Sequence, residues 1–379
     1  MALSSPLGPF ALPTFTSTLK SPTAAFTRPD QPLVPSFTVT LNDKPLANDI
    51  ALWVVSATIE DTVDRASMFT LQLISKEDER STKDWTSDPR LALGAKVELS
   101  MGYGTHLARL IVGDIMSLEP TFTIGGPPTL LVRGFDRRNR LNGVRRSRPF
   151  PKTTDSAVAQ RVCKDLIHIA TTDTRIEHDI VQSDQTDWEF LLERATAIGF
   201  ELVMDPSDGT TMLFRPMGNG APATLTLTLN DDLLEFHPRL SLQPVREVRV
   251  VGWDPKIKDA IVVSLASDSA PPMAGKSLGL QTAAAAIFGE KIVETVARAV
   301  TDVAEAKALA EGRIFKAVLG DVTASGTARG RTDIRAGTVV AIDGLSDVFN
   351  GDYYVESAVH RYAPRAGYLT DFQVKRKAS

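Results

Sequence analysis

Residues 94–104 read GAKVELSMGYG, residues 108–122 read ARLIVGDIMSLEPTF, and residues 129–136 read TLLVRGFD. Apolar residues alternate with polar ones or run together with β-branched neighbours, which is typical of strands. Three earlier segments share this pattern: FTVTL at 37–41, IALWVVSATIE at 50–60 and SMFTLQLI at 67–74. Asn-Asp, Asp-Pro and Gly-Gly pairs between the segments favour turns. About six strands in a hundred residues predict a barrel or sandwich, and we expect a first β-barrel over residues 36–150.

Helical periodicity begins only after Pro151. Val158, Val162, Leu166 and Ile169 recur at steps of three and four residues and predict the buried stripe of a helix. Either Thr154 or Asp155 can cap this helix at its N-terminus.

A second helix is predicted in SDQTDWEFLLERATAIGFELVMD, residues 183–205. Thr186 and Glu189 have the spacing of a capping box, Trp188 begins the apolar face, and Gly199 stands where a C-cap glycine belongs. FELVMD and TTMLFRP flank the turn PSDG and predict a hairpin. We therefore expect a small α+β insertion over residues 151–217.

Strand patterns resume beyond this insertion in ATLTLTL, REVRVVGWD, KDAIVVSLAS, TVVAIDG, DYYVESAVHRY and YLTDFQVKR. A long helix near 302–319, with Asp302 and Glu305 as a capping pair, interrupts them. We expect a second β-barrel over residues 218–379. The fold class is accordingly mainly β, with two β-barrels and a small helical and hairpin domain.

The two β regions are weakly alike. Gly94-x-x-Val97-x-Leu99, then Gly113-Asp114, then TLLVRG, parallels Gly337-x-x-Val340-x-Ile342, then Gly351-Asp352, then YLTDFQV. Glycines before strands are common, so coincidence and a true repeat both remain open. A true repeat gives each chain two copies of one barrel, so that three chains present six.

The remaining composition restricts the class of protein. Seven prolines in residues 1–35 exclude a sustained helix or central strand and predict an extended N-terminal arm. No apolar run is long enough for a membrane span and the N-terminus lacks a signal-peptide pattern, so we expect synthesis in the cytoplasm without membrane insertion. The net charge of -4 argues against a dedicated nucleic-acid binder. The single cysteine, Cys163, is interpreted as a small core residue.

No residue pattern indicates catalysis or a cofactor. The five histidines, spread along the chain, lack metal-ligand spacing, and no Gly-x-Ser-x-Gly elbow is present. The segment from Ala270 to Ser277 resembles a phosphate loop, but its first glycine is replaced by alanine and two prolines remove backbone donors. We expect a protein that is not an enzyme, with no catalytic residue, metal or cofactor.

The densest charged segment is RGFDRRNRLNGVRRSRPF, residues 133–150. Arginine binds phosphate and carboxylate equally well in principle, and the acidic chain favours carboxylate partners. We take Arg137, Arg138, Arg145 and Arg146 as candidate contacts to a neighbouring subunit or partner. Because solvated arginines add little to stability, charge reversal at Arg137 and Arg138 is expected to weaken assembly more than folding.

Several of these segments, in this order, resemble the late control protein D family of contractile phages and the hub part of VgrG proteins. They are QSDQTDWEFLLERATAIGFELVMD, LNGVRRSRPFPKTTDSAVAQRVCKDL, VRVVGWDPKIKDAI, AEAKALAEGR and GLSDVFNGDYYVESAVHRY followed by YLTDFQVKR. The likeness covers about residues 36–377. Its signature residues here are Trp188, Gly199, Gly252, Trp253 and Gly351.

The resemblance implies a structural baseplate hub with two tube-protein-like barrels per chain. It implies a homotrimer that adapts a sixfold tube to a threefold spike, in contact with tube or tube-initiator proteins and other baseplate subunits of a phage tail or injection particle. The chain ends at Ser379, after the last barrel strand, so the spike is expected as a separate polypeptide. The alternatives are a cell-wall hydrolase accessory to a tail and a nucleic-acid-binding β protein. The sequence does not distinguish a phage tail from a bacteriocin or an extracellular injection system.

Overall fold

The computed structural model describes residues 34–46, 53–74, 89–124, 126–218, 223, 225–242, 245, 247–270, 273–288, 293–297, 300, 302–364 and 366–377. The chain divides into Met1–Leu33 and Val34–Ser379. The proline-rich arm expected over residues 1–35 lies outside the described residues except for Val34 and Pro35, and Pro35 already begins a strand.

The first β unit contains strands β1 to β7 and the short helix η2, Pro89–Leu91. The strands are β1 Pro35–Leu41, β2 Lys44–Pro45, β3 Val54–Thr62, β4 Met68–Ile74, β5 Lys96–Tyr103, β6 His106–Thr121 and β7 Thr129–Asp136. They pair in the order β3-β4-β7-β6-β5-β1-β2. Alternate residues such as Phe69, Leu71 and Leu73 of β4 face one shared core, as the alternation in the sequence predicts.

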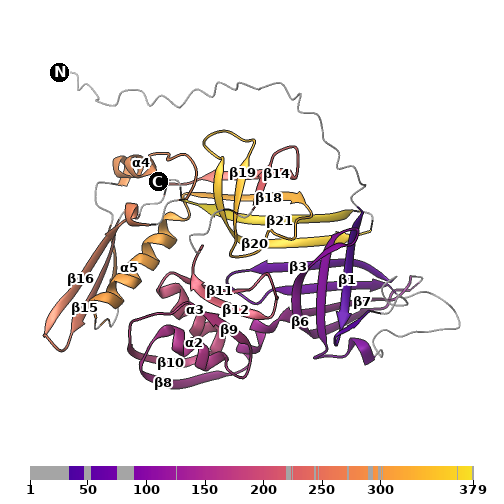
Figure 1. The fold of residues 1–379 in the computed structure, drawn as a ribbon, viewed down its shortest axis with the longest axis horizontal. Coiled ribbons are helices and arrows are strands. Elements are labelled where there is room, and N and C mark those ends of the chain that lie inside the picture. The colour runs from indigo at the N-terminus through magenta and orange to yellow at the C-terminus, as the bar shows by residue number, and fades with distance from the viewer. Residues whose placement is uncertain are drawn as a thin grey trace. The chain divides into compact units, whose positions relative to one another are not determined.

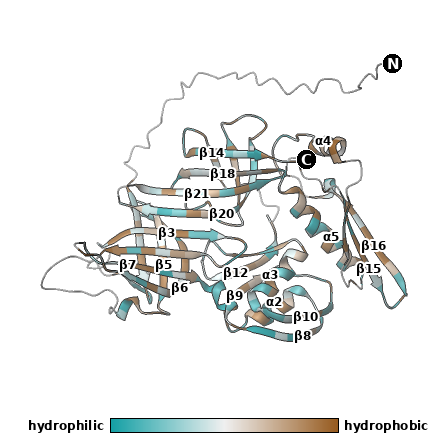
Figure 2. Cartoon of the chain, turned by 180° about the vertical axis from the view of Figure 1, so that it is seen from behind, coloured by the Kyte–Doolittle hydropathy of each residue, from teal (hydrophilic) through white to brown (hydrophobic). Residues whose placement is uncertain are grey.

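The second β unit has the order β14-β18-β21-β20-β19-β13. Its strands are β13 Leu225–Thr228, β14 Leu233–Leu240, β18 Val322–Arg329, β19 Val339–Asp343, β20 Gly351–Ala363 and β21 Gly367–Arg376. These strands enclose their own apolar core, which includes Val340, Tyr353 and Phe372. Apolar and polar residues alternate along the strands of both units (Figure 2).

The two units are joined in one 13-stranded sheet. The second half of β20 pairs antiparallel with β3, from Ser357 opposite Thr62 to Tyr362 opposite Ala57 (Figure 1). The sequence predicted mainly β structure, which is confirmed, but it gave no sign of this junction. Pairing between strands almost three hundred residues apart leaves no local pattern in the sequence.

The two units repeat one another in register. Gly94 N–H donates to Ile115 O and Ile115 N–H to Ala95 O, just as Gly337 N–H donates to Val355 O and Val355 N–H to Thr338 O. Irregularities in pairing recur at the same places: Ile115/Ser117 in β6 matches Val355/Ser357 in β20, and Val54/Ser56 in β3 matches Leu233/Glu235 in β14. Strands β3-β4-β7-β6-β5 therefore correspond to β14-β18-β21-β20-β19. A bulge is a specific feature of a strand pair, so its recurrence supports a true repeat.

The repeat expected from the sequence needs one correction. Gly94 and Val97 do correspond to Gly337 and Val340. Gly113, however, lies opposite Val97, whereas the residue opposite Val340 is Tyr353. Gly351 therefore corresponds to a position two residues before Gly113 in the first unit. The match between Gly113-Asp114 and Gly351-Asp352 in the sequence was a coincidence.

The α+β insertion follows β7 through the short helix η3, Arg137–Asn142. It contains β8 Arg145–Thr153, α2 Asp155–Cys163, β9 His168–Thr171, β10 His178–Thr186, α3 Asp187–Ala197, β11 Phe200–Met204 and β12 Thr211–Pro216. Thr154 caps α2, the Thr186–Glu189 capping box begins α3, and β11 and β12 form the predicted hairpin. Cys163 is buried in the core of the insertion.

A further unit lies between β14 and β18. It consists of β15 Glu247–Asp254, β16 Asp259–Ala266, η4 Ser267–Ser269, α4 Leu280–Phe288, β17 Val293–Ala297 and α5 Val303–Val318. The strands β16-β15-β17 form a separate three-stranded sheet against which α5 packs. The expected assignment of REVRVVGWD and KDAIVVSLAS to the second barrel is therefore wrong, because their inner face is covered by α5 rather than by the barrel core. Asp302 caps α5, as predicted.

Both additions begin at the same end of the large sheet, which we call the junction end. Strands β3, β7, β14 and β21 all finish there, since Gly113 pairs with Asp136 and Val322 pairs with both Leu240 and Arg376. At the opposite end, which we call the hairpin end, the equivalent hairpins β6–β7 and β20–β21 turn back. The two β units of the chain are therefore alike at the hairpin end, whereas at the junction end each is followed by a different addition.

Candidate assembly site

The arginine run forms ion pairs largely within its own chain. Arg133 pairs with Glu119, Arg140 with Asp114, Arg145 with Asp184 and Glu189, and Arg146 and Arg148 with Asp187. The preference for carboxylate that the sequence indicated is thus met by intrachain partners. Arg145 and Arg146 remain about half exposed.

Arg138 differs from the solvated residue that the sequence led us to expect. It is fully buried, and its guanidinium donates to Asp136 Oδ2, Ser67 Oγ, Thr62 O and Leu202 O at 2.6–3.0 Å. Leu202 belongs to the insertion and the other partners to the first β unit. Arg138 also lies 5.8 Å from the centre of the Trp188 ring. It is therefore an internal connection between the two units, available to no other subunit while the chain is folded.

Arg137, next to Arg138 in η3, is only partly buried. Its Nε is buried and has no hydrogen-bond partner among the described residues. The sequence does not distinguish these two neighbours, but their side chains occupy different environments. The cause is the tight 3-10 turn, which directs adjacent side chains to different sides.

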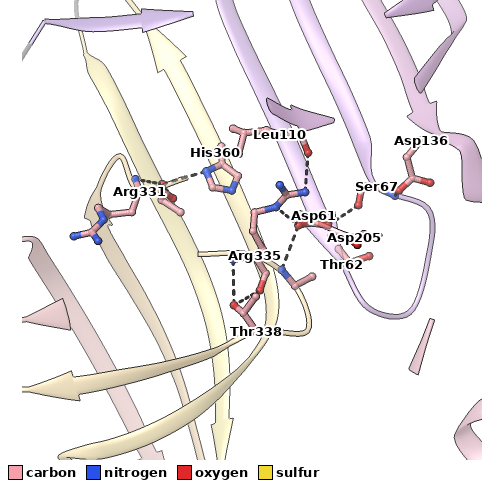
Figure 3. A network of polar contacts seen from close by, with 12 residues as sticks. Asp61, Thr62, Ser67, Leu110, Asp136, Asp205, Arg331, Arg335, Thr338 and His360 are labelled. Atoms are coloured by element: carbon pink, nitrogen blue, oxygen red, sulfur yellow. Dashed lines mark hydrogen bonds and ion pairs between the residues drawn. The ribbon is translucent and has the colours of Figure 1, made fainter. Parts of the chain in front are cut away.

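A second buried arginine, Arg335, connects the two β units (Figure 3). Its Nε donates to Asp61 Oδ2 at 2.7 Å and its Nη2 to Leu110 O at 2.7 Å. Ala336 N–H and Ser67 Oγ also donate to the Asp61 carboxylate. Burial raises the pKa of Asp61, but the charges of Arg335 and Arg138 and these hydrogen bonds outweigh it, so the pKa lies below its usual value.

His360 lies beside this network and is fully buried. Its Nδ1 lies 2.9 Å from Tyr368 Oη. Burial and the charge of Arg335 lower the pKa of His360 to about 3, so the imidazole is neutral at physiological pH. Arg335 was not singled out by the sequence, because its partners Asp61 and Leu110 are distant in the chain.

The signature residues of the insertion have structural roles. Trp188 is buried in the core that α2, α3 and the β11–β12 hairpin share. Gly199 has φ 71° and ends α3, and a Cβ there would lie 2.8 Å from Gly312 Cα in α5. Its missing side chain therefore also permits close approach of α5, a reason that the sequence did not reveal.

The remaining signature residues differ in burial. A Cβ at Gly252 would lie 2.5 Å from Val300 O, and one at Gly351, which has φ 140°, would lie 2.4 Å from Ala274 O. Both glycines therefore allow close backbone contacts. Trp253, in contrast, is 54% exposed and lies on the face of β15 opposite α5.

Among the described residues, two of the open strand edges of the large sheet belong to β6 and β14. β6 pairs with β5 only as far as Asp114, so the edge of residues 116–121 that faces away from β7 has no partner. β14 pairs along one side with β18 and, beyond Leu233, with no strand on the other. Exposed apolar side chains accompany both edges, among them Met116 and Phe122 at β6 and Leu234 and Leu240 at β14. Such edges are surfaces to which another strand can add.

The described part of the chain contains no group of three or more His, Cys, Asp or Glu side chains that could hold a metal ion. Within the same residues, no helix combines the length and apolar character needed to cross a membrane.

Comparison with solved structures finds tail proteins with this fold. The 43 kDa tail protein of prophage MuSo2 from Shewanella oneidensis is 16% identical, with 91% of this chain and 99% of that chain covered and a TM-score of 0.65. A tail protein from Neisseria meningitidis MC58 is 13% identical, with 90% and 97% covered and a TM-score of 0.63. The E. coli c3393 protein, a component of the type VI secretion system with structural similarity to T4 tail proteins gp27 and gp5, is 11% identical, with 90% and 77% covered and a TM-score of 0.58. At these identities the likeness establishes a shared fold.

No curated protein sequence matches the chain. The family model that matches is not the late control protein D family, which the sequence resembles, but the Alg8 N-terminal domain, over residues 31–363. Since this match spans most of the chain, the protein belongs to the Alg8 N-terminal domain family.

Proposed function

We propose that this protein is a structural baseplate hub of a phage tail or contractile injection system, and that three copies form a ring. The shared fold supports this proposal, because the proteins with which it is shared are described as tail proteins and as a type VI secretion component. The motifs that resemble late control protein D and VgrG hubs point in the same direction.

The internal repeat is the observation that carries the proposal. Each chain supplies two β units that agree in strand order, in register and in the position of two bulges. Three chains in a ring thus present six similar units. Cyclic assemblies of this kind use head-to-tail interfaces and close when the rotation between subunits is a whole fraction of a turn.

The two ends of such a ring have different symmetry. At the hairpin end each chain contributes the two equivalent hairpins β6–β7 and β20–β21, so this end approximates sixfold symmetry. At the junction end each chain contributes one α+β insertion and one β15–β17 unit with α5, so this end is threefold. A sixfold tube or tube initiator fits the hairpin end, and a trimeric spike fits the junction end. The protein then acts as a symmetry adaptor and not as an enzyme.

Other baseplate subunits are expected around this ring. The half-exposed Arg145 and Arg146 are candidate contacts for them. Both ion pairs of Arg145 are exposed to solvent, and Arg146 makes only a long 3.6 Å pair with the buried Asp187, which Arg148 contacts at 2.5 Å. The assembled particle, rather than the free chain, is the expected functional location.

Solution mass and electron microscopy test the proposal. We expect the protein to have three times the chain mass of 41.1 kDa, either alone or, once the mass of the spike is subtracted, in its complex with the spike. Averaged images should show six lobes at one end and three at the other. A mass near 41.1 kDa at assembly concentrations with the spike present would contradict the trimer. Rings of three without a sixfold-like end would contradict the adaptor role.

A further inference from the structure

The strand pairing that joins the two β units within one chain has equivalent strands at the outer edges of the sheet, and these strands are not paired with each other. Inside the chain, the second half of β20 pairs with β3. By the internal repeat, β20 corresponds to β6 and β3 corresponds to β14. The second half of β6 and the outer side of β14 are the two open edges described above. Each chain thus has one open edge that corresponds to β20 and one that corresponds to β3. The two open edges are therefore complementary in the same way as β20 and β3, which pair inside the chain.

We infer that, in the proposed ring, β14 of one copy adds antiparallel to residues 117–121 of β6 in the next copy. This inference rests on the proposed trimer. The repeat sets the register of this pairing. Inside the chain, Glu60 of β3 lies opposite Val359 of β20, and the corresponding pair between copies is Arg239 of β14 opposite Glu119 of β6. In the same way, the internal pair Thr58–Arg361 corresponds to His237 opposite Thr121. Arginine and glutamate therefore meet directly across the interface.

The close spacing of these pairs follows from the hydrogen bonds of the internal junction. Val63 N–H donates to Glu356 O, which makes Thr58–Arg361 and Glu60–Val359 non-hydrogen-bonded pairs. Side chains are closest at such pairs, where Cα atoms lie about 4.5 Å apart. The Glu119–Arg239 pair is accordingly at a position where opposite charges attract most strongly. Arg239 is exposed and has no carboxylate partner among the described residues, while Glu119 accepts a hydrogen bond from Ser117 Oγ at 3.0 Å and makes a long 3.6 Å ion pair with Arg133.

The residues beside the open edges also suit a subunit interface. Inside the chain, Asp61 and Arg335 form a buried ion pair next to the β3–β20 junction. Their counterparts by the repeat are Leu240 and Ala92, and Leu240 is 43% exposed. The ion pair beside the internal junction is thus replaced by apolar residues beside the open edges. Apolar surface, unlike a buried ion pair, can be exposed in a free chain and then covered on association without leaving an unpaired charge.

Two prolines interrupt the backbone hydrogen bonds at the centre of the proposed β6–β14 pairing. Pro120 and Pro238 fall opposite each other, at the position of His360 and Ile59 in the internal junction. Neither has an N–H, so this pair forms no ladder bond and the backbone contact depends on the pairs on either side. Prolines on an edge also protect the free chain from indiscriminate strand addition. The interface therefore depends strongly on side-chain contacts such as Glu119–Arg239.

Cross-linking of the full-length protein tests the register. The pair Thr121→Cys and His237→Cys should form disulfides between copies on mild oxidation, giving covalent dimers and trimers on a non-reducing gel. The expected Cα spacing of about 4.5 Å is within the range of disulfides. The matched control, Thr121→Cys with Glu235→Cys, is shifted by two residues and should not cross-link. Buried Cys163 is retained in both.

A charge exchange tests the contact itself. Arg239→Glu should raise the protein concentration needed for half-maximal trimer formation severalfold, because it places two carboxylates opposite each other at every interface. Glu119→Arg in the same chain should restore assembly, which a merely destabilised fold would not do. Trimers without the specific cross-link and unaffected by Arg239→Glu would overturn this pairing and leave the hub proposal intact. A monomeric wild-type protein would overturn both.

Discussion

Replacement of Arg138 by methionine is expected to destabilise the folded chain before it affects assembly. The guanidinium is fully buried and uses its five N–H donors on Asp136, Ser67, Thr62 and Leu202. Methionine has similar length but leaves the buried Asp136 carboxylate without its cation. Removal of one partner from a buried ion pair costs about 3–5 kcal/mol, a large part of the 5–15 kcal/mol that is typical of a domain.

Urea denaturation followed by tryptophan fluorescence measures this loss. With an m-value of about 3 kcal/mol per molar urea, the midpoint should fall by about 1–2 M. Arg146→Met is the matched control, since Arg146 is half exposed and its ion pair with Asp187 is 3.6 Å long. Its midpoint should change by no more than about 0.3 M, because a half-exposed arginine contributes at most about 1 kcal/mol and Asp187 keeps its ion pair with Arg148. If both variants unfold at the wild-type midpoint, Arg138 is not the buried connection described here. The sequence predicted that charge reversal at Arg138 weakens assembly more than folding. Because Arg138 is buried, we expect folding to fail first.

Two further predictions concern stability. Because burial and the charge of Arg335 lower the pKa of His360 to about 3, the folded chain excludes a proton that the unfolded chain binds below pH 6.5. Stability should therefore be complete above pH 6.5 and fall by up to about 1.4 kcal/mol per pH unit as the pH approaches 3. His360→Gln should reduce this slope and His106→Gln, at an exposed position, should not; equal slopes in thermal melts would refute the assignment. Trp188→Ala should cost about 3–5 kcal/mol and give insoluble or protease-sensitive protein, since the ring is buried in the insertion core. A folded, trimeric Trp188→Ala protein with an unchanged midpoint in inactive particles would instead indicate a binding site there.

Much of the fold could be predicted because the relevant forces act between residues close in sequence. The capping of α2 by Thr154, the capping box of α3 and the positive φ of Gly199 are local choices of backbone and side chain. The alternation in β4 and its neighbours likewise follows from one face being buried. The interpretation of Trp188 as a structural residue rests on the same local pattern, since its large apolar ring lies on the buried stripe of an amphipathic helix.

The candidate site could be predicted less well. Seven arginines close together in sequence looked like one exposed surface, yet Arg138 is internal and most of the others are paired within the chain. An arginine can be buried wherever the fold supplies its partners, and here one of them, Leu202 O, is 64 residues away. The β15–β16 hairpin was misassigned for a related reason: apolar alternation shows that a face is covered but does not identify what covers it.

The sequence by itself determined that this protein is mainly β, where α2, α3 and α5 begin, and that parts of its two β units are alike. It did not determine the end of α2, which stops at Cys163 although the apolar spacing continues to Ile169 in β9. These properties follow from periodicity, turn residues and caps, which act over a few residues. Only the tertiary structure decided that β20 joins β3, that Arg335 and Asp61 connect the two halves, and that β6 and β14 are left with open edges. Strand pairing satisfies backbone groups that are the same in every residue, so the choice of partner depends on where the whole chain places each edge.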